Sequence, residues 1–228
     1  MVFIMINKFV PVITIDGPSA SGKSTICKIV SKILGWNILS SGLIYRSFAF
    51  FLKKNKIEKY IYQDYNLLIR YLNIFIYKDV FFYFLKDNNI FNQIYTSEID
   101  NIASKLSVYY FVRKLLLPYH YFFRKLPGLV ADGRDMGTIV FPDANIKIFI
   151  DSNINIRVKR RMLQLQKNNI YVSFNSLKYL MKDRDDRDCN RFYAPLYCSN
   201  DMFIIDSTLL SIEQVIDNVM QYVYKKLH

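Results

Sequence analysis

The segment that most constrains this chain is G-P-S-A-S-G-K-S at residues 17–24, which matches the pattern G-x-x-x-x-G-K-[ST]. Residues 10–15 before it form an apolar run that predicts a buried strand. Residues 23–34 after it carry apolar side chains at helical spacing, and Gly35 is placed to end that helix. A strand before and a helix after are what a phosphate-binding loop requires, so we prefer that interpretation to a chance glycine-rich turn.

Such a loop binds phosphate through its geometry. The glycines let the backbone wrap closely, so that successive N–H groups and the positive end of the helix dipole point at phosphate oxygens. Lys23 is expected to reach the β- and γ-phosphates of a nucleotide, and the Ser24 hydroxyl to ligate Mg²⁺. The loop alone does not name a reaction, because GTPases, helicases, transport ATPases and small-molecule kinases all have one. The predicted nucleotide-binding residues are Gly17, Pro18, Ser19, Ala20, Ser21, Gly22, Lys23, Ser24 and Thr25.

Short apolar strands alternate with helices along most of the chain, which predicts an α/β fold with a parallel sheet covered on both faces. Between residues 60 and 125 the pattern changes, and we expect an insert that contains a strand hairpin at 72–77 and 80–85. The other strands are expected at 37–39, 129–132, 146–150 and 202–205. The other helices are expected at 43–52, 97–106, 109–125, 155–167, 173–188 and 211–227, with Pro118 kinking or shortening the third of these and a capping box starting the last.

The amino-acid composition limits which cellular compartment and which binding partners the chain is expected to have. With 52% hydrophobic and 22% charged residues, the 228-residue chain can bury a sizeable core. Three cysteines without a C-x-x-C motif argue against a disulfide framework or a structural zinc site, and favour reduced thiols in the cytoplasm. We expect no signal peptide and no membrane span. The net charge of +12 would suit RNA or a polyanionic substrate, but the lysines are spread out, which favours a solvated surface over specific nucleic-acid binding.

Polar residues follow the later strands. Asp132 ends a predicted strand, where it would lie near the phosphate loop and hold Mg²⁺ through water; a simple turn aspartate is the alternative. Lysine dominates elsewhere, but arginine recurs where strand and helix ends should face the cleft, and its planar fork matches phosphate. These arginines are Arg46, Arg113, Arg134, Arg157, Arg160, Arg161, Arg184, Arg187 and Arg191.

The densest charge run is R-D-D-R-D-C-N-R at 184–191. One interpretation is a set of i,i+3 and i,i+4 ion pairs on an exposed helix. The other is a carboxylate, Asp188, that accepts ribose hydroxyls while Arg184 and Arg191 on the same helical face hold phosphate.

These segments together resemble the bacterial cytidylate (CMP/dCMP) kinase family, from about residue 10 to the C-terminus and most weakly at 55–100. The block A-D-G-R-D-M-G-T and the Arg/Asp run are more specific than the loop. The segments that carry the resemblance are I-T-I-D-G-P-S at 13–19, S-G-L-I-Y-R at 41–46, A-D-G-R-D-M-G-T at 131–138, F-P-D-A at 141–144, R-M-L-Q-L at 161–165, residues 184–191 with A-P-L at 194–196, D-S-T at 206–208 and S-I-E-Q-V at 211–215.

The resemblance implies a P-loop nucleoside-monophosphate kinase fold with a five-stranded parallel sheet in one domain. Its core would span about 9–60, 128–152 and 186–228, its NMP-binding insert about 61–127 and its lid about 153–172. The reaction implied is ATP + CMP ⇌ ADP + CDP, with dCMP also accepted, in pyrimidine nucleotide metabolism. The cofactor implied is ATP with Mg²⁺, and we expect a monomer.

Site roles follow from the resemblance residue by residue. The residues implied for the monophosphate are Ser41, Arg46 and Arg134, with Tyr45 beside them as a further substrate-binding residue. Those for the cytosine are Ser104, Arg113 and Asp135, and those for the sugar and phosphate are Arg184, Asp188 and Arg191. Those for catalysis are Lys23, Arg134, Arg157, Arg160 and Arg191, with Arg157, Arg160 and Arg161 in the lid, and those for the metal are Ser24 and, through water, Asp132.

A cytosine reader of this kind has a physical basis. Arg113 can donate to the O2 and N3 acceptors of the ring while Asp135 or Ser104 accepts from the N4 amine. A uracil would place a carbonyl against Asp135 and leave a buried carboxylate unpaired, which is costly. The nearest alternative is a kinase for UMP or AMP. A nucleotide-binding regulator or RNA-binding protein is the alternative from another class, and it would bind nucleic acid in a salt-dependent way without turnover.

Three positions depart from the family pattern. Ser40 stands where an aspartate is usual, and Cys189 replaces a usual arginine, which removes a cation. Ser24 replaces a common glycine and restores the hydroxyl of the general phosphate-loop pattern.

Overall fold

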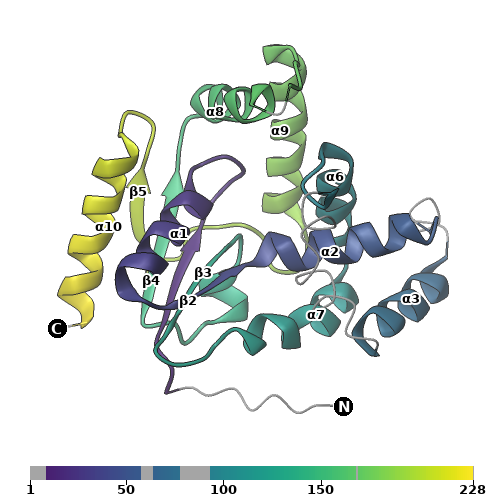
Figure 1. Ribbon diagram of the computed structural model, residues 1–228, viewed down its shortest axis with the longest axis horizontal. Coiled ribbons are helices and arrows are strands. Elements are labelled where there is room, and N and C mark those ends of the chain that lie inside the picture. The colour runs from purple at the N-terminus through teal and green to yellow at the C-terminus, as the bar shows by residue number, and fades with distance from the viewer. Residues whose placement is uncertain (1–8, 58–63, 78–92, 168, 228) are drawn as a thin grey trace. The chain divides into compact units, whose positions relative to one another are not determined.

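The computed structural model describes residues 9–57, 64–77, 93–167 and 169–227, and it divides the chain into two compact units (Figure 1). The first unit comprises residues 1–39 and 123–228, and the second comprises residues 40–122. No helix within the described ranges is long and apolar enough to cross a membrane.

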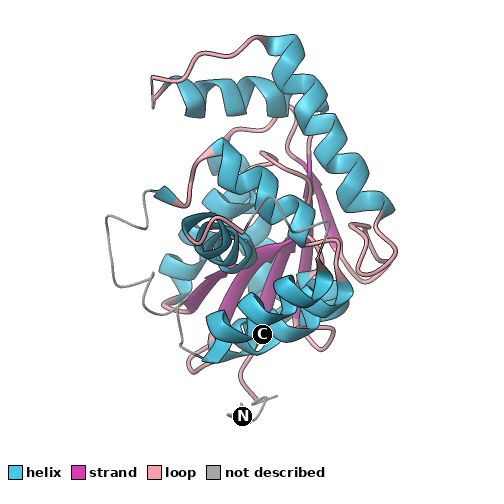
Figure 2. Ribbon diagram, turned by 90° about the vertical axis from the view of Figure 1, so that its right-hand side faces the viewer, coloured by secondary structure: helices cyan, strands magenta, loops and turns pink. Residues whose placement is uncertain are grey.

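A five-stranded sheet forms the centre of the first unit, in the order β2-β3-β1-β4-β5. β1 pairs in parallel with β3 and β4, and β4 pairs in parallel with β5, so the predicted parallel sheet is confirmed (Figure 2). Because β1 lies between β3 and β4, the loop after β1 and the polar residues after β3 meet at one edge of the sheet. The strands are β1 (Val12–Asp16), β2 (Asn37–Ser40), β3 (Leu129–Gly133), β4 (Ile146–Asp151) and β5 (Phe203–Asp206).

Helices α1 (Lys23–Leu34) and α10 (Ile212–Leu227) cover one face of this sheet and lie side by side (Figure 1). Ile13 and Ile15 of β1 point into the core that these helices close. Gly35 ends α1 in the left-handed conformation, as expected. At the start of α10, Ser211 and Gln214 exchange side-chain hydrogen bonds with each other's backbone N–H, so the capping box is confirmed.

The opposite side of β1 faces a short π-helix, η2 (Met136–Val140). Asp16 is fully buried there, and its two carboxylate oxygens accept the backbone N–H groups of Met136 at 2.9 Å and Gly137 at 2.8 Å. Gly137 lies so close to β1 that a Cβ on it would be 2.7 Å from the hydroxyl of Thr14. The buried carboxylate therefore fixes the backbone that follows the Asp132 to Asp135 segment.

Helices α8 (Ile154–Gln166) and α9 (Phe174–Asn190) contact each other and build a small core of their own (Figure 1). Asn153 and Ser173 cap their N-termini by accepting backbone N–H groups. The buried side chains between them are Val158, Leu165, Leu177 and Met181.

The described part of the second unit is helical. Its core is aromatic, with the rings of Phe48 and Phe75 5.2 Å apart and Leu52 and Leu72 fully buried. Thr96 caps α6 by accepting the N–H of Ile99. The helices are α2 (Ser41–Lys54), α3 (Tyr65–Tyr77), α6 (Ser97–Leu106) and α7 (Tyr110–Phe122).

The strand expected at 72–77 is wrong, because these residues belong to α3. Leu68, Leu72 and Phe75 are the fully or almost fully buried residues of this helix, at spacings of four and three that belong to a helix. The many aromatic and β-branched side chains favoured a strand, but tertiary packing decided the outcome. The second expected strand, 80–85, lies outside the described residues. Helix α7 continues through Pro118 and ends at Phe122, three residues before the predicted end.

Candidate active site

The phosphate-binding loop has the backbone shape that its glycines predict. Gly17 has φ +149°, and a Cβ on it would lie 2.1 Å from the carbonyl oxygen of Ile150. Gly22 precedes α1 in the left-handed conformation, with φ 101°. Any larger residue at either position would push the backbone out of this shape.

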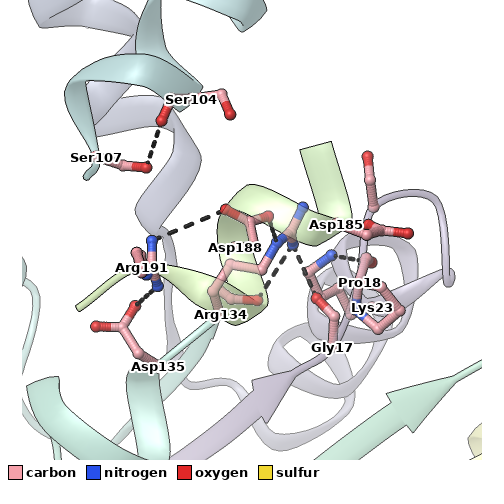
Figure 3. Close-up of polar contacts among 12 residues, drawn as sticks. Gly17, Pro18, Lys23, Ser104, Ser107, Arg134, Asp135, Asp185, Asp188 and Arg191 are labelled. Carbon is pink, nitrogen blue, oxygen red and sulfur yellow. Dashed lines mark hydrogen bonds and ion pairs between the residues drawn. The ribbon is translucent and has the colours of Figure 1, made fainter. Parts of the chain in front are cut away.

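Lys23 is buried at the first turn of α1, and its ammonium group donates to the carbonyl of Pro18 at 2.8 Å (Figure 3). Burial, and next the charge of Arg134, hold the pKa of Lys23 well below its usual value. A polyphosphate bound in the loop would reverse this shift, because its negative charge favours the charged ammonium. The burial and lowered pKa of Lys23 therefore suit an anionic ligand.

Ser24 and Asp132 form the part of the site suited to a metal ion. The Ser24 hydroxyl donates to a carboxylate oxygen of Asp132 at 2.7 Å, which joins α1 to the end of β3. Hydroxyl and carboxylate oxygens are ligands that Mg²⁺ prefers, and Mg²⁺ usually keeps water and substrate phosphate as its other ligands. Within the described ranges no cluster of three acidic, histidine or cysteine side chains could hold a metal alone. The pair thus fits a metal ion that arrives with a nucleotide.

Arg134 connects the segment after β3 to the phosphate loop. Its Nε donates to Asp188 of α9 at 2.7 Å, and one of its terminal nitrogens donates to the carbonyl of Gly17 at 2.9 Å (Figure 3). The two bonds leave the guanidinium plane fixed beside the loop. Asp188 is thus brought to the loop by a tertiary contact.

Arg191 forms a second group with the same carboxylate. Its side chain is almost fully buried, 3.4 Å from Asp135 and 3.8 Å from Asp188, and its Nε donates to the carbonyl of Ala194. The structure therefore brings Arg134, Asp135, Asp188 and Arg191 together, as Figure 3 shows. Arg184 lies on α9 one turn before Asp188.

The charge state of Asp188 follows from these arginines. Burial alone would raise the pKa of Asp188, but Arg134, Arg184 and Arg191 outweigh burial and hold the pKa below its usual value. The carboxylate is therefore ionised at neutral pH and can accept hydrogen bonds from the hydroxyl groups of a ligand.

Two arginines of α8 bind the backbone of the phosphate loop. Arg157 donates to the carbonyls of Ser152 and Ser19 and forms a 2.6 Å ion pair with Asp185. Arg160 donates to the carbonyls of Ser21 and Ser207, at 3.3 and 2.6 Å. Arg161, by contrast, donates to the side-chain oxygen of the exposed Gln164, which lies 3.3 Å away on the same helix. Arg157 and Arg160 therefore position the loop in this structure.

The second unit carries the remaining predicted residues. Arg46 forms a 3.3 Å ion pair with Asp100, and Arg113 donates to the carbonyl of Ser107 at 3.2 Å and lies over the ring of Tyr45. The hydroxyl of Ser104 is buried and has no hydrogen-bond partner among the described residues. A buried orphan hydroxyl is costly unless a ligand satisfies it, which supports a binding role for Ser104.

Sequence reasoning named Asp188 but missed Asp185, and it did not predict which arginines of other elements pair with these two aspartates. In the run 184–191, Asp185 pairs with Arg157 and Asp188 with Arg134, from different elements. Asp183 and Arg187 form the kind of i,i+4 pair that the exposed-helix interpretation predicts. The four acidic residues within six positions could have indicated tertiary partners, because like charges on adjacent turns destabilise an isolated helix.

A phosphate-binding loop, a buried lysine, a serine and aspartate pair suited to Mg²⁺, and arginines held in place by carboxylates define a P-loop phosphotransferase. The family model for cytidylate kinase matches residues 13–225. The chain belongs to the cytidylate kinase family.

Two curated relatives show how far the similarity extends. The cytidylate kinase of Klebsiella pneumoniae (strain 342) is 44% identical over 220 residues, which is 96% of this chain and 97% of that protein. The cytidylate kinase of Salmonella choleraesuis (strain SC-B67) is 45% identical over 219 residues, which is 95% of this chain and 96% of that protein.

Proposed function

We propose that the protein transfers the γ-phosphate of ATP to CMP, and also to dCMP, in pyrimidine nucleotide metabolism. The observation that carries this proposal is the group of Arg134, Asp135, Asp188 and Arg191 beside the phosphate loop, in a chain of the cytidylate kinase family. A phosphate-binding loop alone would support any nucleotide hydrolase. The guanidinium groups of Arg134 and Arg191 add positive charge for a second, anionic substrate.

The acceptor is already a phosphate anion, so the reaction needs no side chain to remove a proton from it. Catalysis then comes from positioning and from charge stabilisation of the transferring phosphoryl group. Lys23, Arg134 and Arg191 would supply this charge, with Arg157 and Arg160 contributing from α8.

Mg²⁺ would neutralise the phosphates of ATP, held by Ser24 directly and by Asp132 through water. The 2.7 Å contact between these two side chains supports the pairing. The bound metal would supply a positive charge that polarises the phosphoryl group, and the oxygens of Ser24 and Asp132 would orient it.

For the acceptor, Ser41, Tyr45 and Arg46 would bind the monophosphate, and Ser104, Arg113 and Asp135 the cytosine. Arg184, Asp188 and Arg191 would contact the sugar and phosphate. The orphan hydroxyl of Ser104 and the ionised carboxylate of Asp188 support these roles.

The division into a core, an NMP-binding insert at about 61–127 and a lid at about 153–172 is part of the same proposal. We also propose that the enzyme is a cytoplasmic monomer that binds no specific nucleic acid. A set of three cysteines without a C-x-x-C motif supports a reducing compartment. Sedimentation of the purified protein at several concentrations tests the monomer.

The test offers ATP and Mg²⁺ with CMP, dCMP, UMP or AMP in separate reactions and follows ADP formation. We expect turnover with CMP and dCMP, and kcat/KM at least about tenfold lower with UMP and AMP. Good turnover with AMP and none with CMP would overturn the proposal.

A further inference from the structure

A buried histidine contacts one of the residues proposed to bind the monophosphate. His120 of α7 is 1% exposed, and its Nε2 lies 3.0 Å from the hydroxyl oxygen of Ser41, the first residue of α2. Its other ring nitrogen, Nδ1, lies 3.1 Å from the carbonyl oxygen of Leu116. None of the proposed functions above uses this histidine.

The carbonyl oxygen fixes the tautomer of His120. A carbonyl has no hydrogen to give, so Nδ1 must carry the proton in this contact. In the neutral ring Nε2 then accepts, and Ser41 must point its single hydroxyl hydrogen at the ring. The neutral histidine therefore accepts the only hydrogen bond that the Ser41 hydroxyl can donate.

A phosphate group offers only acceptors to the protein when it is fully ionised. Ser41 can help bind it only as a donor, so its hydrogen must first be released from Nε2. A second proton on His120 would release it, because Nε2–H would then donate to the Ser41 oxygen and leave the hydroxyl hydrogen free.

We propose that His120 is a positioning residue that sets the direction of the Ser41 hydroxyl hydrogen, so that binding of the monophosphate is accompanied by uptake of a proton at His120. This proposal rests on the proposed function, because Ser41 is a phosphate ligand only in that account. His120 would then influence acceptor affinity through Ser41.

The surroundings of His120 suit such a coupling. The ring centroids of Tyr45, on α2, and His120 are 6.1 Å apart. The guanidinium of Arg113, on α7, lies over the Tyr45 ring, 5.7 Å from its centroid. From α3, Phe75 contacts Tyr119, the neighbour of His120 in sequence. Near-complete burial disfavours a charged imidazole, whereas a phosphate dianion bound at Ser41 would favour it. The two protonation states therefore respond to the ligand.

The first experiment follows the imidazole directly by NMR. The chain has two histidines, His120 and His228. The ring signals that disappear in an H228Q variant belong to His228, so the remaining signals belong to His120. In the wild type, His228 then serves as an internal reference. We expect the His120 signals to report an Nδ1–H neutral ring without ligand, and CMP in the absence of ATP to shift its titration to higher pH. A His120 titration that CMP leaves unchanged would overturn the proposal, whether or not the enzyme turns over CMP.

The second experiment measures KM for CMP between pH 6 and 8 in the wild type, H120Q, S41A and the double variant. A glutamine amide can donate from Nε2 at any pH, so H120Q should abolish the part of the pH dependence that comes from His120, and should leave only the ionisation of CMP itself. We expect the wild-type KM for CMP to rise about tenfold more than the H120Q value over this range, with kcat and the KM for ATP changed little.

The double variant separates a positioning role from a structural one. If His120 acts through Ser41, H120Q changes the pH dependence in the Ser41 background and has no effect in the S41A background. Equal slopes in the wild type and H120Q, or the same effect of H120Q in both backgrounds, would overturn the proposal. Absence of any turnover with CMP would instead overturn the proposed function, and the NMR result would still decide the role of His120.

Discussion

Arg134 and Asp188 lie 2.7 Å apart, from Nε to the carboxylate, and the same guanidinium donates to the carbonyl of Gly17 in the phosphate loop. One planar group thus joins the end of β3, helix α9 and the loop after β1. A point charge cannot replace it, because the two bonds use different nitrogens of the fork. The proposed catalytic geometry depends on this pair.

Replacing Arg134 by lysine tests that dependence. An ammonium keeps the charge but cannot reach Asp188 and Gly17 with the same geometry, so we expect kcat/KM for CMP to fall about 100-fold. The same change at the exposed Arg70 of α3 should alter kcat/KM by less than about twofold. A steady-state comparison of the two variants measures both effects, and equal activity in R134K and R70K would contradict the role of the fork.

Asp135 is proposed to accept the N4 amine of cytosine. In D135N the amide can turn a donor toward the base, which suits the carbonyl of uracil. We expect the ratio of kcat/KM for CMP to that for UMP to fall at least about tenfold. D183N, in an exposed ion pair with Arg187, makes the same chemical change and should leave the ratio unaltered. A ratio that survives in D135N would show that another group reads the base.

Ser24 and Asp132 are proposed to hold Mg²⁺. In S24A the concentration of Mg²⁺ at half-maximal rate should rise about tenfold, because a direct oxygen ligand is lost. S31A, on the same helix, removes a hydroxyl that bonds the Trp36 carbonyl, and should lower stability without changing the Mg²⁺ dependence. Chelation of Mg²⁺ should stop turnover in all variants. An S24A enzyme with the wild-type Mg²⁺ dependence would exclude Ser24 as a ligand.

The stability of the fold should depend on pH through Asp16. Burial raises the pKa of Asp16 from 3.8 to about 7, although the N–H groups of Met136 and Gly137 lower it. The folded state then binds more protons than the unfolded state between these two values, so the free energy of unfolding falls as pH rises from about 4 to about 7. The loss is on the order of 4 kcal/mol when it is complete.

Denaturation by urea at pH 5 and pH 8 measures this loss. The D16N variant cannot titrate at this position, so the stability difference between the wild type and D16N should shrink as pH rises. D16N should also be less stable at pH 5, because its amide offers one oxygen to two N–H donors. A difference that stays constant across pH would mean that the two backbone hydrogen bonds keep Asp16 ionised throughout.

Much of the first unit could be predicted from the sequence. The bounds of α1 follow from the phosphate-loop pattern, its apolar spacing and Gly35, and the start of α10 follows from Ser211 and Gln214. These features work locally, within one helix and its caps. Strands β1, β3 and β4 were equally clear, because each is a short apolar run with an aspartate at its last or next-to-last position.

Other parts depend on contacts that sequence periodicity does not contain. Residues 72–77 of helix α3 were mistaken for a strand because many of their side chains are β-branched or aromatic, and only the packing around Phe75 shows the helical face. The π-helix after Asp135 is held by Asp16, which is 120 residues away in sequence. The sequence around His120 did not indicate a role for this residue, because the proposed role depends on its contact with Ser41 of α2. Which arginine pairs with which aspartate likewise depends on the tertiary fold.

The most direct test of the central claim follows the phosphate itself. ATP labelled in its γ-phosphate is incubated with Mg²⁺, CMP and the enzyme, and the products are separated. We predict that the label appears in CDP, that little is released as inorganic phosphate, and that transfer to AMP and UMP is at least about tenfold slower. Label that appears only in inorganic phosphate, or that enters ADP formed from added AMP in preference to CDP, would contradict the account.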